Sequence, residues 1–183
     1  MSLSITIELS DSDLDHFRDA MKTASENASK LSDQEILAKA EQAIAEMEQA
    51  KLPEFVAERV DSLEALMAAV KDEEWQMPEE EKRDILTSLA YFTEPEDMVP
   101  DHIPGLGYLD DAIMIELVIQ DMSLDLSAYQ EFCSFRSTEE NRRGAEAKVD
   151  RESWLAGTRS QIRSNLRKKR SSGVRRRVFG RIM

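Results

Sequence analysis

Apolar side chains recur every three or four residues along most of the chain, which is the spacing of an α-helix. The first clear stripe follows Ser32 and Glu35, which form a Ser-x-x-Glu capping-box pattern. The stripes of this and the next predicted helix are Ile36, Leu37, Ala40, Ala43, Ile44 and Met47, and Val56, Val60, Leu63, Met67 and Val70. The same spacing predicts helices after Ser10, over 79–92 and 109–122, around 126–133 and at the basic end, with a loop over 23–31. The chain is therefore predicted to be all-α.

The predicted elements divide the chain into four parts. Alternating residues 4–9 predict either a short N-terminal β-strand or a loose leader, so residues 1–9 are set apart. Residues 10–136 form the helical body, 137–152 a polar linker and 153–183 a basic helical tail. We expect a compact bundle of about six or seven helices, with 109–122 buried at its centre because it is apolar on most sides.

Composition excludes several classes of protein. With 1 Cys and 2 His, the chain has no internal disulfide framework and too few ligands for a usual His/Cys zinc site. No window of about 18 apolar residues occurs, so we expect no integral membrane span. The first residues lack a basic start and an apolar core, so we expect no secretory signal and a cytoplasmic location, with peripheral membrane association as an alternative.

A connection rich in proline and aspartate precedes the central predicted helix. Its spacing is Pro-x-Asp-x-x-Pro-Asp-x-x-Pro-x-x-Gly-x-x-Asp-Asp, formed by Pro95, Asp97, Pro100, Asp101, Pro104, Gly107, Asp110 and Asp111. The pattern resembles the signature of the YkvA-like family, a bacterial domain of unknown function, over about residues 83–120. The resemblance implies a helical hairpin with an ordered connection, and no established catalysis. Many relatives are described as membrane-associated, but charged residues such as Arg83 and Glu116 make integral insertion of this chain doubtful.

Four carboxylates of this connection form a candidate metal site. Asp97, Asp101, Asp110 and Asp111 supply the oxygen ligands that Mg²⁺ or Ca²⁺ prefers, with His102 as an acid or base beside them. The structural alternative is that they accept backbone hydrogen bonds at turns and at a helix start. The first interpretation predicts a metal-dependent enzyme, and the second predicts no cofactor.

The net charge of −13 conceals two electrostatic halves. Residues 153–183 contain ten Lys/Arg and no Asp/Glu, whereas residues 1–152 contain 14 Lys/Arg and 37 Asp/Glu, so the charges are +10 and −23. Leu155, Ile162 and Leu166 form a narrow apolar stripe beside the cations. The cations of this tail are Arg159, Arg163, Arg167, Lys168, Lys169, Arg170, Arg175, Arg176, Arg177 and Arg181.

Such a tail has three candidate partners: nucleic acid or the ribosome, an anionic membrane surface, and the acidic body of the same or a second copy of the chain. The sequence does not separate them. We expect a non-enzymatic, cytoplasmic interaction or adaptor protein whose tail binds an anionic partner. The metal-dependent enzyme is the alternative.

Overall fold

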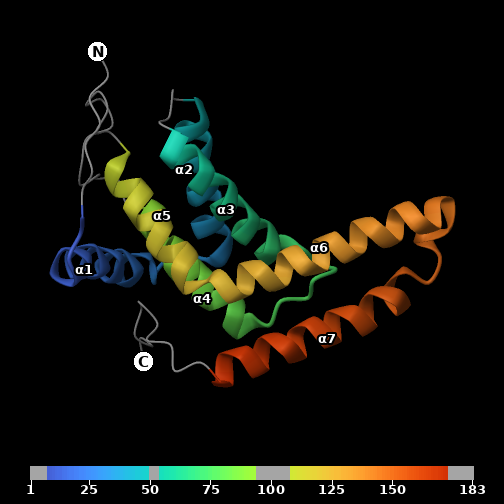
Figure 1. Ribbon diagram of the computed structural model, residues 1–183. Helices are drawn as coiled ribbons and strands as arrows, with labels where there is room; N and C mark the ends of the chain where they lie inside the picture. Colours follow the sequence, from blue (N-terminus) through green and yellow to red (C-terminus); the bar gives the residue numbers. More distant parts are fainter. Residues whose placement is uncertain (1–7, 50–53, 94–107, 173–183) are drawn as a thin grey trace, which may run out of the picture.

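The computed structural model describes residues 8–49, 54–93 and 108–172, and these ranges contain seven α-helices and no strand (Figure 1). The predicted strand over 4–9 lies mostly outside them. The elements are α1 (Asp11–Ala28), α2 (Asp33–Gln49), α3 (Glu54–Lys71), α4 (Glu79–Leu89), the 3-10 helix η1 (Ala90–Thr93), α5 (Leu109–Asp121), α6 (Ser123–Arg143), the 3-10 helix η2 (Gly144–Lys148) and α7 (Arg151–Ser172). The predicted all-α fold is confirmed.

Two helices begin at side-chain caps that satisfy backbone N–H groups otherwise left without partners. Before α2, the Ser32 N–H donates to Glu35 at 2.8 Å, and the Glu35 N–H donates to Ser32 Oγ at 3.3 Å. The capping box predicted at this position is confirmed. Ser10 and Asp13 form the same reciprocal pair before α1, and hydrogen bonds from Ser10 lower the pKa of Asp13.

Helix α5 lies at the centre of the body, as its apolar sequence predicts. Met114, Ile115 and Val118 are fully buried, and α5 packs against α3 and also contacts α1 and α6. Figure 1 shows α5 crossing in front of α4 and beside α3. Burial of an aliphatic side chain contributes roughly 1.5–3 kcal/mol, so these residues are a principal source of the body's stability.

Two helices are longer than the hydrophobic pattern predicts. Helix α1 continues through the expected loop at 23–31 as far as Ala28, because Ala24 and Ala28 are buried and pack there despite their small apolar surface. Helix α6 continues through Arg143, into the segment 137–152 that we expected to be a polar linker. Ion pairs within the helix, from Arg142 and Arg143 to Glu139, support this polar part of α6.

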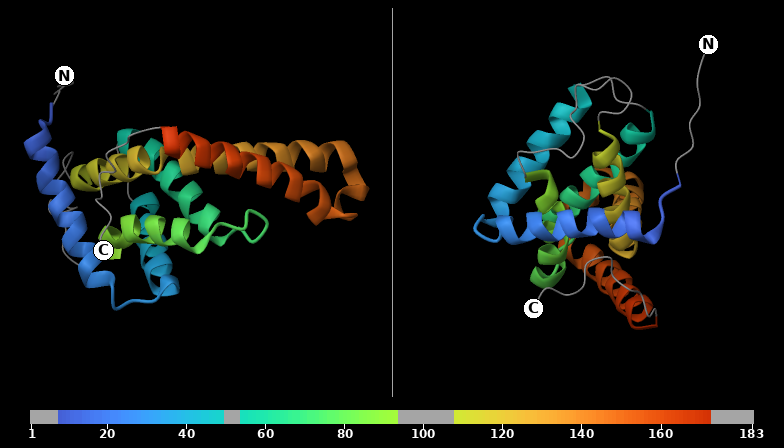
Figure 2. Two further views of the ribbon diagram at one scale, coloured as in Figure 1. Left: turned by 90° about the horizontal axis from the view of Figure 1, so that it is seen from below. Right: turned by 90° about the vertical axis from the view of Figure 1, so that its left-hand side faces the viewer.

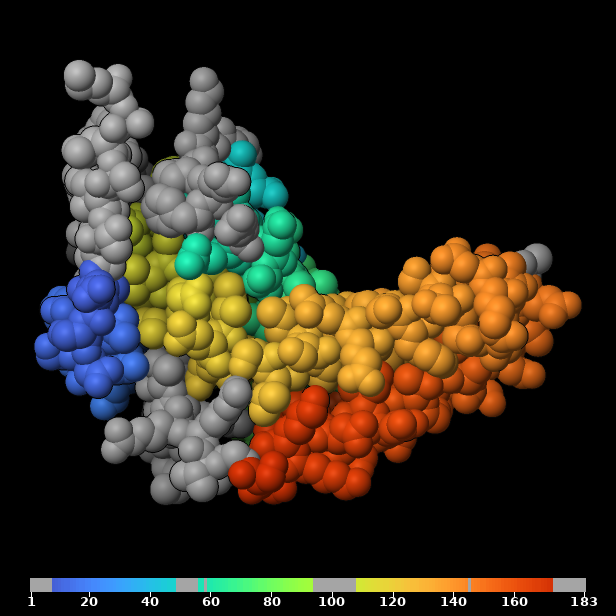
Figure 3. All heavy atoms as spheres, viewed as in Figure 1, coloured from blue at the N-terminus to red at the C-terminus, as the bar shows by residue number. Residues whose placement is uncertain are grey.

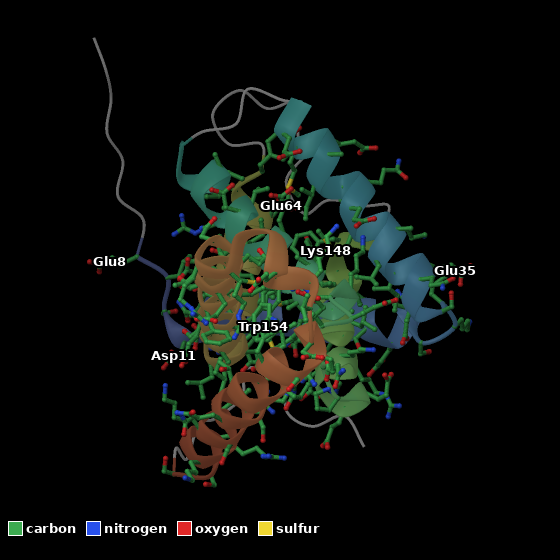
Figure 4. All side chains as sticks on the ribbon, turned by 90° about the vertical axis from the view of Figure 1, so that its right-hand side faces the viewer. Glu8, Asp11, Glu35, Glu64, Lys148 and Trp154 are labelled. Atoms are coloured by element: carbon green, nitrogen blue, oxygen red, sulfur yellow. The ribbon has the colours of Figure 1, made fainter. Side chains whose placement is uncertain are left out.

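Helices α6 and α7 form an antiparallel pair that extends beyond the rest of the body (Figures 1 and 2). We call the part formed by residues 135–158 the arm. The chain reverses at Gly144, whose φ of 56° favours glycine. The Trp154 ring lies 5.0 Å from the Arg143 guanidinium and 5.3 Å from that of Arg151, so aromatic and cationic groups stabilise the arm. Figure 4 labels Trp154 on this arm and shows Glu8 and Glu35 at the edges of the molecule.

Candidate functional site

Helix α7 is bound to the body by a narrow apolar stripe. Leu155, Ile162 and Leu166 are 1–3% exposed, and α7 packs along α6. These are the three residues predicted to form the stripe. Because these apolar residues occupy one side of α7, they hold the neighbouring arginines beside the body. There the arginines contact the α3–α4 loop and the first turns of α4 and α6.

Asp72 closes the α3–α4 loop (residues 72–78) with four hydrogen bonds. Its Oδ1 accepts from the backbone N–H groups of Glu74 and Trp75 at 2.9 and 3.2 Å. Its Oδ2 accepts from the Tyr129 hydroxyl at 3.0 Å and from Arg136 at 2.7 Å. Burial raises the pKa of Tyr129, and the neighbouring Cys133 and Asp72 act in the same direction, so the Tyr129 hydroxyl stays protonated and serves as a donor. The cluster therefore fixes the shape of the loop.

Glu74 connects this loop to both helices of the arm. It accepts from Arg136 at 3.0 Å and from Arg151 Nη2 at 2.9 Å. The hydrogen bond from Arg151 is the main reason why the pKa of Glu74 lies below its ordinary value, and burial opposes it. The Glu74 carbonyl also accepts from Arg159 at 2.7 Å. Arg159 is only 8% exposed and pairs in addition with Glu152.

Arg163 binds the buried Trp75 in two ways. Its Nη2 donates to the Trp75 carbonyl at 2.9 Å, and its guanidinium lies 4.3 Å from the centre of the indole ring. Phe132 contacts the same ring at a centroid distance of 5.1 Å. Burial lowers the pKa of Arg163, and the nearby Glu81 opposes this effect. Arg163 is therefore part of the packed interior.

Two carboxylates, one partly buried and one buried, hold the other end of α7. Glu81 accepts from Arg163 at 3.1 Å and from Arg170 at 3.2 Å, and Asp125 forms an ion pair with Arg170. The Glu81 and Asp125 side chains are 12% and 8% exposed. Both lie in the first turns of their helices, where the helix dipole also favours negative charge. We call Glu74, Glu81 and Asp125, which each bind an arginine of α7, the acidic seat of α7.

The structure thus separates the tail residues that the sequence brings together. Arg159, Arg163 and Arg170 bind the chain's own carboxylates and carbonyls. Arg167, Lys168 and Lys169 are exposed, and their side chains form no ion pair with the described residues. Arg175, Arg176, Arg177 and Arg181 lie outside the described residues. Among the members of the predicted anion-binding set that the structure describes, this exposed trio on α7 is open to solvent.

The candidate metal ligands are only partly described. Asp110 and Asp111 lie in the first turn of α5, 1% and 6% exposed, and Asp110 accepts a hydrogen bond from the Tyr91 hydroxyl at 3.3 Å. Asp97 and Asp101 lie outside the described residues, as do His102, Pro95, Pro100, Pro104 and Gly107. No group of three His, Cys, Asp or Glu side chains in 8–49, 54–93 and 108–172 is arranged to hold a metal ion. The two described carboxylates occupy positions where the helix dipole favours their charge.

The sequence interpretation did not find the acidic seat. One signal was present: Met122, Asp125, Tyr129 and Phe132 follow helical spacing, so Asp125 falls among apolar residues on the buried side of α6. A carboxylate at such a position indicates a buried partner of opposite charge. Nothing local indicates Glu81, because it is one of three consecutive glutamates at the start of α4.

An apolar hollow of about 200 Å³ lies elsewhere, between the start of α1, α3 and α5. Leu14, Ala112 and Ile113 contribute to its lining, and Arg59 and Glu116, paired at 2.9 Å, are its charged members. The described structure brings no nucleophile to this hollow.

Fold and site together define an all-α protein with a basic helix held on its own carboxylates. Residues 85–117 match the model of a family described as a protein of unknown function (DUF1232). The match covers the end of α4, η1 and α5 as far as Leu117, and supports an uncharacterised domain family for this segment. The more specific resemblance to the YkvA-like family stays a prediction. No curated protein and no solved structure matches the chain.

Proposed function

We propose that this protein is a non-enzymatic, cytoplasmic interaction protein whose basic C-terminal segment binds an anionic partner. The observation that carries the proposal is the exposure of Arg167, Lys168 and Lys169 on a helix that is itself fixed to the body. A fixed helix presents its cations in one arrangement, so less entropy is lost on binding than with a flexible segment. Within the described ranges, no helix is long and apolar enough to cross a membrane.

The internal contacts of α7 also support docking of the tail on the chain's own body. Arg159 donates to the Glu74 carbonyl, and Arg163 and Arg170 pair with Glu81 and Asp125. We therefore assign partner binding to the other tail cations, which are Arg167, Lys168, Lys169, Arg175, Arg176, Arg177 and Arg181. A nucleic acid and an anionic membrane surface are both compatible with this assignment.

The test must leave the acidic seat intact. Deleting residues 158–183 would remove Ile162, Leu166 and Arg163 from the core, so loss of binding would not be distinguishable from loss of folding. The triple substitution R167Q/K168Q/K169Q removes three exposed charges and keeps good helix formers. The matched control is K22Q/K30Q/K39Q, which removes three exposed charges from α1, α2 and the turn between them.

The probe is immobilised heparin, a sulfated polyanion, eluted with increasing NaCl. We expect the full chain to bind despite its net charge of −13, and the α7 triple variant to elute at lower salt than the control variant. Neutralising Arg175, Arg176 and Arg177 should shift elution in the same direction. Failure of the full chain to bind, or equal elution of the α7 variant and the control, would refute the proposal.

A further inference from the structure

We propose that the anionic partner is a double-stranded nucleic acid, which the outward face of α7 contacts through the phosphate backbone. This inference rests on the proposed function and specifies the partner that it leaves open. Four features of α7 support it: the chemistry of its exposed face, the position of its apolar stripe, its local charge balance and its length.

The exposed face of α7 carries neutral polar side chains, cations and one glycine, and no carboxylate. Between Gly157 and Ser172 no acidic residue occurs. Serine, asparagine, glutamine, lysine and arginine side chains supply most protein contacts to phosphate and sugar oxygens in nucleic-acid complexes. The exposed residues of this face are Gly157, Ser160, Gln161, Asn165, Arg167, Lys168, Lys169, Ser171 and Ser172.

The apolar stripe of α7 faces the body rather than solvent. A helix that lies on a membrane surface inserts an apolar face between the lipid headgroups. In α7 the residues that would form this face, Leu155, Ile162 and Leu166, are 1–3% exposed and packed in the core. Helix α7 cannot insert them without leaving its seat, so its folded arrangement favours a polar, phosphate-rich partner over a bilayer.

Local charges leave a net positive surface despite the acidic body. Three arginines of α7, Arg159, Arg163 and Arg170, are matched by three carboxylates, Glu152, Glu81 and Asp125. These three pairs are neutral together, so they do not cancel the three exposed cations. At physiological salt the screening length is about 8 Å, which weakens repulsion from the more distant acidic helices.

The dimensions of α7 and the absence of aromatic rings from its exposed face, over the described residues 157–172, favour a duplex. The 16 residues from Gly157 to Ser172 span about 24 Å at the α-helical rise, enough to follow several phosphates spaced about 3.4 Å per base pair along a strand. Binding to single strands commonly relies on bases stacked on aromatic side chains. The exposed face contains none, and Trp154 is engaged by Arg143 and Arg151 in the arm. Figure 3 shows α7 forming one edge of the molecule.

The experiment measures binding of the full chain to a fluorescent 20-base-pair DNA duplex, an RNA duplex and a single strand of the same sequence. Vesicles of phosphatidylglycerol at equal phosphate concentration form the fourth probe. The affinity for duplex is measured between 50 and 200 mM salt. We expect both duplexes to bind with little dependence on sequence, and to bind better than the single strand and the vesicles.

The magnitude follows from counterion release. Three phosphate contacts contribute about 2.7 to the slope of log affinity against log salt, or about 40-fold in affinity between 50 and 200 mM. R167Q/K168Q/K169Q should reduce the slope by this amount, whereas K22Q/K30Q/K39Q should leave it unchanged. Circular dichroism of both variants confirms that the helices are retained.

Preference for vesicles or for the single strand over the duplexes, or an unchanged slope in the α7 variant, would overturn the duplex assignment. The proposed function would survive the first of these results if heparin binding still depended on the α7 trio. Absence of binding to heparin, nucleic acid and vesicles alike would refute both proposals.

Discussion

Glu81 provides the sharpest test of how α7 is held on the body. Its carboxylate accepts hydrogen bonds from both Arg163 and Arg170, and the side chains of Glu81 and Arg163 are only 12% and 13% exposed. The substitution Glu81→Gln removes the negative charge and keeps the shape and one acceptor oxygen. It leaves two partly buried guanidinium groups facing a neutral amide.

Breaking a buried ion pair by removing one partner costs about 3–5 kcal/mol. Because the glutamine oxygen still accepts one hydrogen bond and Arg170 keeps Asp125, we expect roughly half of this, about 2 kcal/mol. For a chain of this size that corresponds to a fall of about 4–8 °C in melting temperature. Urea unfolding followed by tryptophan fluorescence measures the free energy, since Trp75 lies under Arg163.

The matched control is Glu79→Gln, in the same first turn of α4. Glu79 is 76% exposed, and its partner among the described residues is Lys82, three residues away. The same substitution should therefore cost no more than about 0.5 kcal/mol. A double-mutant cycle of Glu81→Gln with Arg170→Gln should give a coupling free energy of about 1 kcal/mol. Equal destabilisation by the Glu79 and Glu81 substitutions, with no coupling to Arg170, would show that the buried carboxylate does not hold α7.

Two further predictions concern the backbone and the response to acid. Gly144→Ala places a side chain at φ 56° and should destabilise the protein by about 1–3 kcal/mol. Gly157→Ala lies in an exposed part of α7 with open space around it and should stabilise the protein by about 0.5–1 kcal/mol. The melting temperatures of the two variants should therefore shift in opposite directions, and shifts of the same sign would contradict the backbone argument. Arg151 holds the pKa of Glu74 below its ordinary value of 4.5, so the unfolded chain binds a proton before the folded protein does as the pH falls through about 4.5. The free energy of unfolding should therefore fall as the pH falls through this range, and it should fall less in Glu74→Gln. Urea melts of both proteins at about pH 5 and pH 3 measure the difference. An equal loss of unfolding free energy in the two proteins would rule out this contribution.

The parts of the fold that could be predicted are those encoded locally. The capping box of Ser32 and Glu35 involves residues three apart in the sequence. The burial of Met114 and Val118 follows from a helix that is apolar around most of its circumference. The stripe of Leu155, Ile162 and Leu166 was predictable for the same reason. Each of these features depends on interactions or periodicity within a few turns of chain.

The partners within the acidic seat could not be predicted, because its ion pairs join residues far apart in the sequence. Arg163 and Glu81 are separated by 82 residues, and Arg170 and Asp125 by 45. Periodicity places the arginines on one stripe but does not distinguish those that meet a carboxylate from those that face solvent. The extension of α6 to Arg143 was missed for a different reason, since its polar residues are stabilised by intrahelical ion pairs and by packing of α7 rather than by an apolar pattern.

The position of the acidic seat has a consequence for the order of folding during synthesis. Arg159 and Arg163 reach back 85 and 88 residues to the carbonyls of Glu74 and Trp75. At a translation rate of about 5–20 residues per second, Arg159 and Arg163 are synthesised roughly 4–18 seconds after the α3–α4 loop. The two arginines leave the ribosome later still. During this interval the Trp75 ring and the loop carbonyls lack the helix that covers them. The nascent body therefore depends on its last described helix to complete its interior.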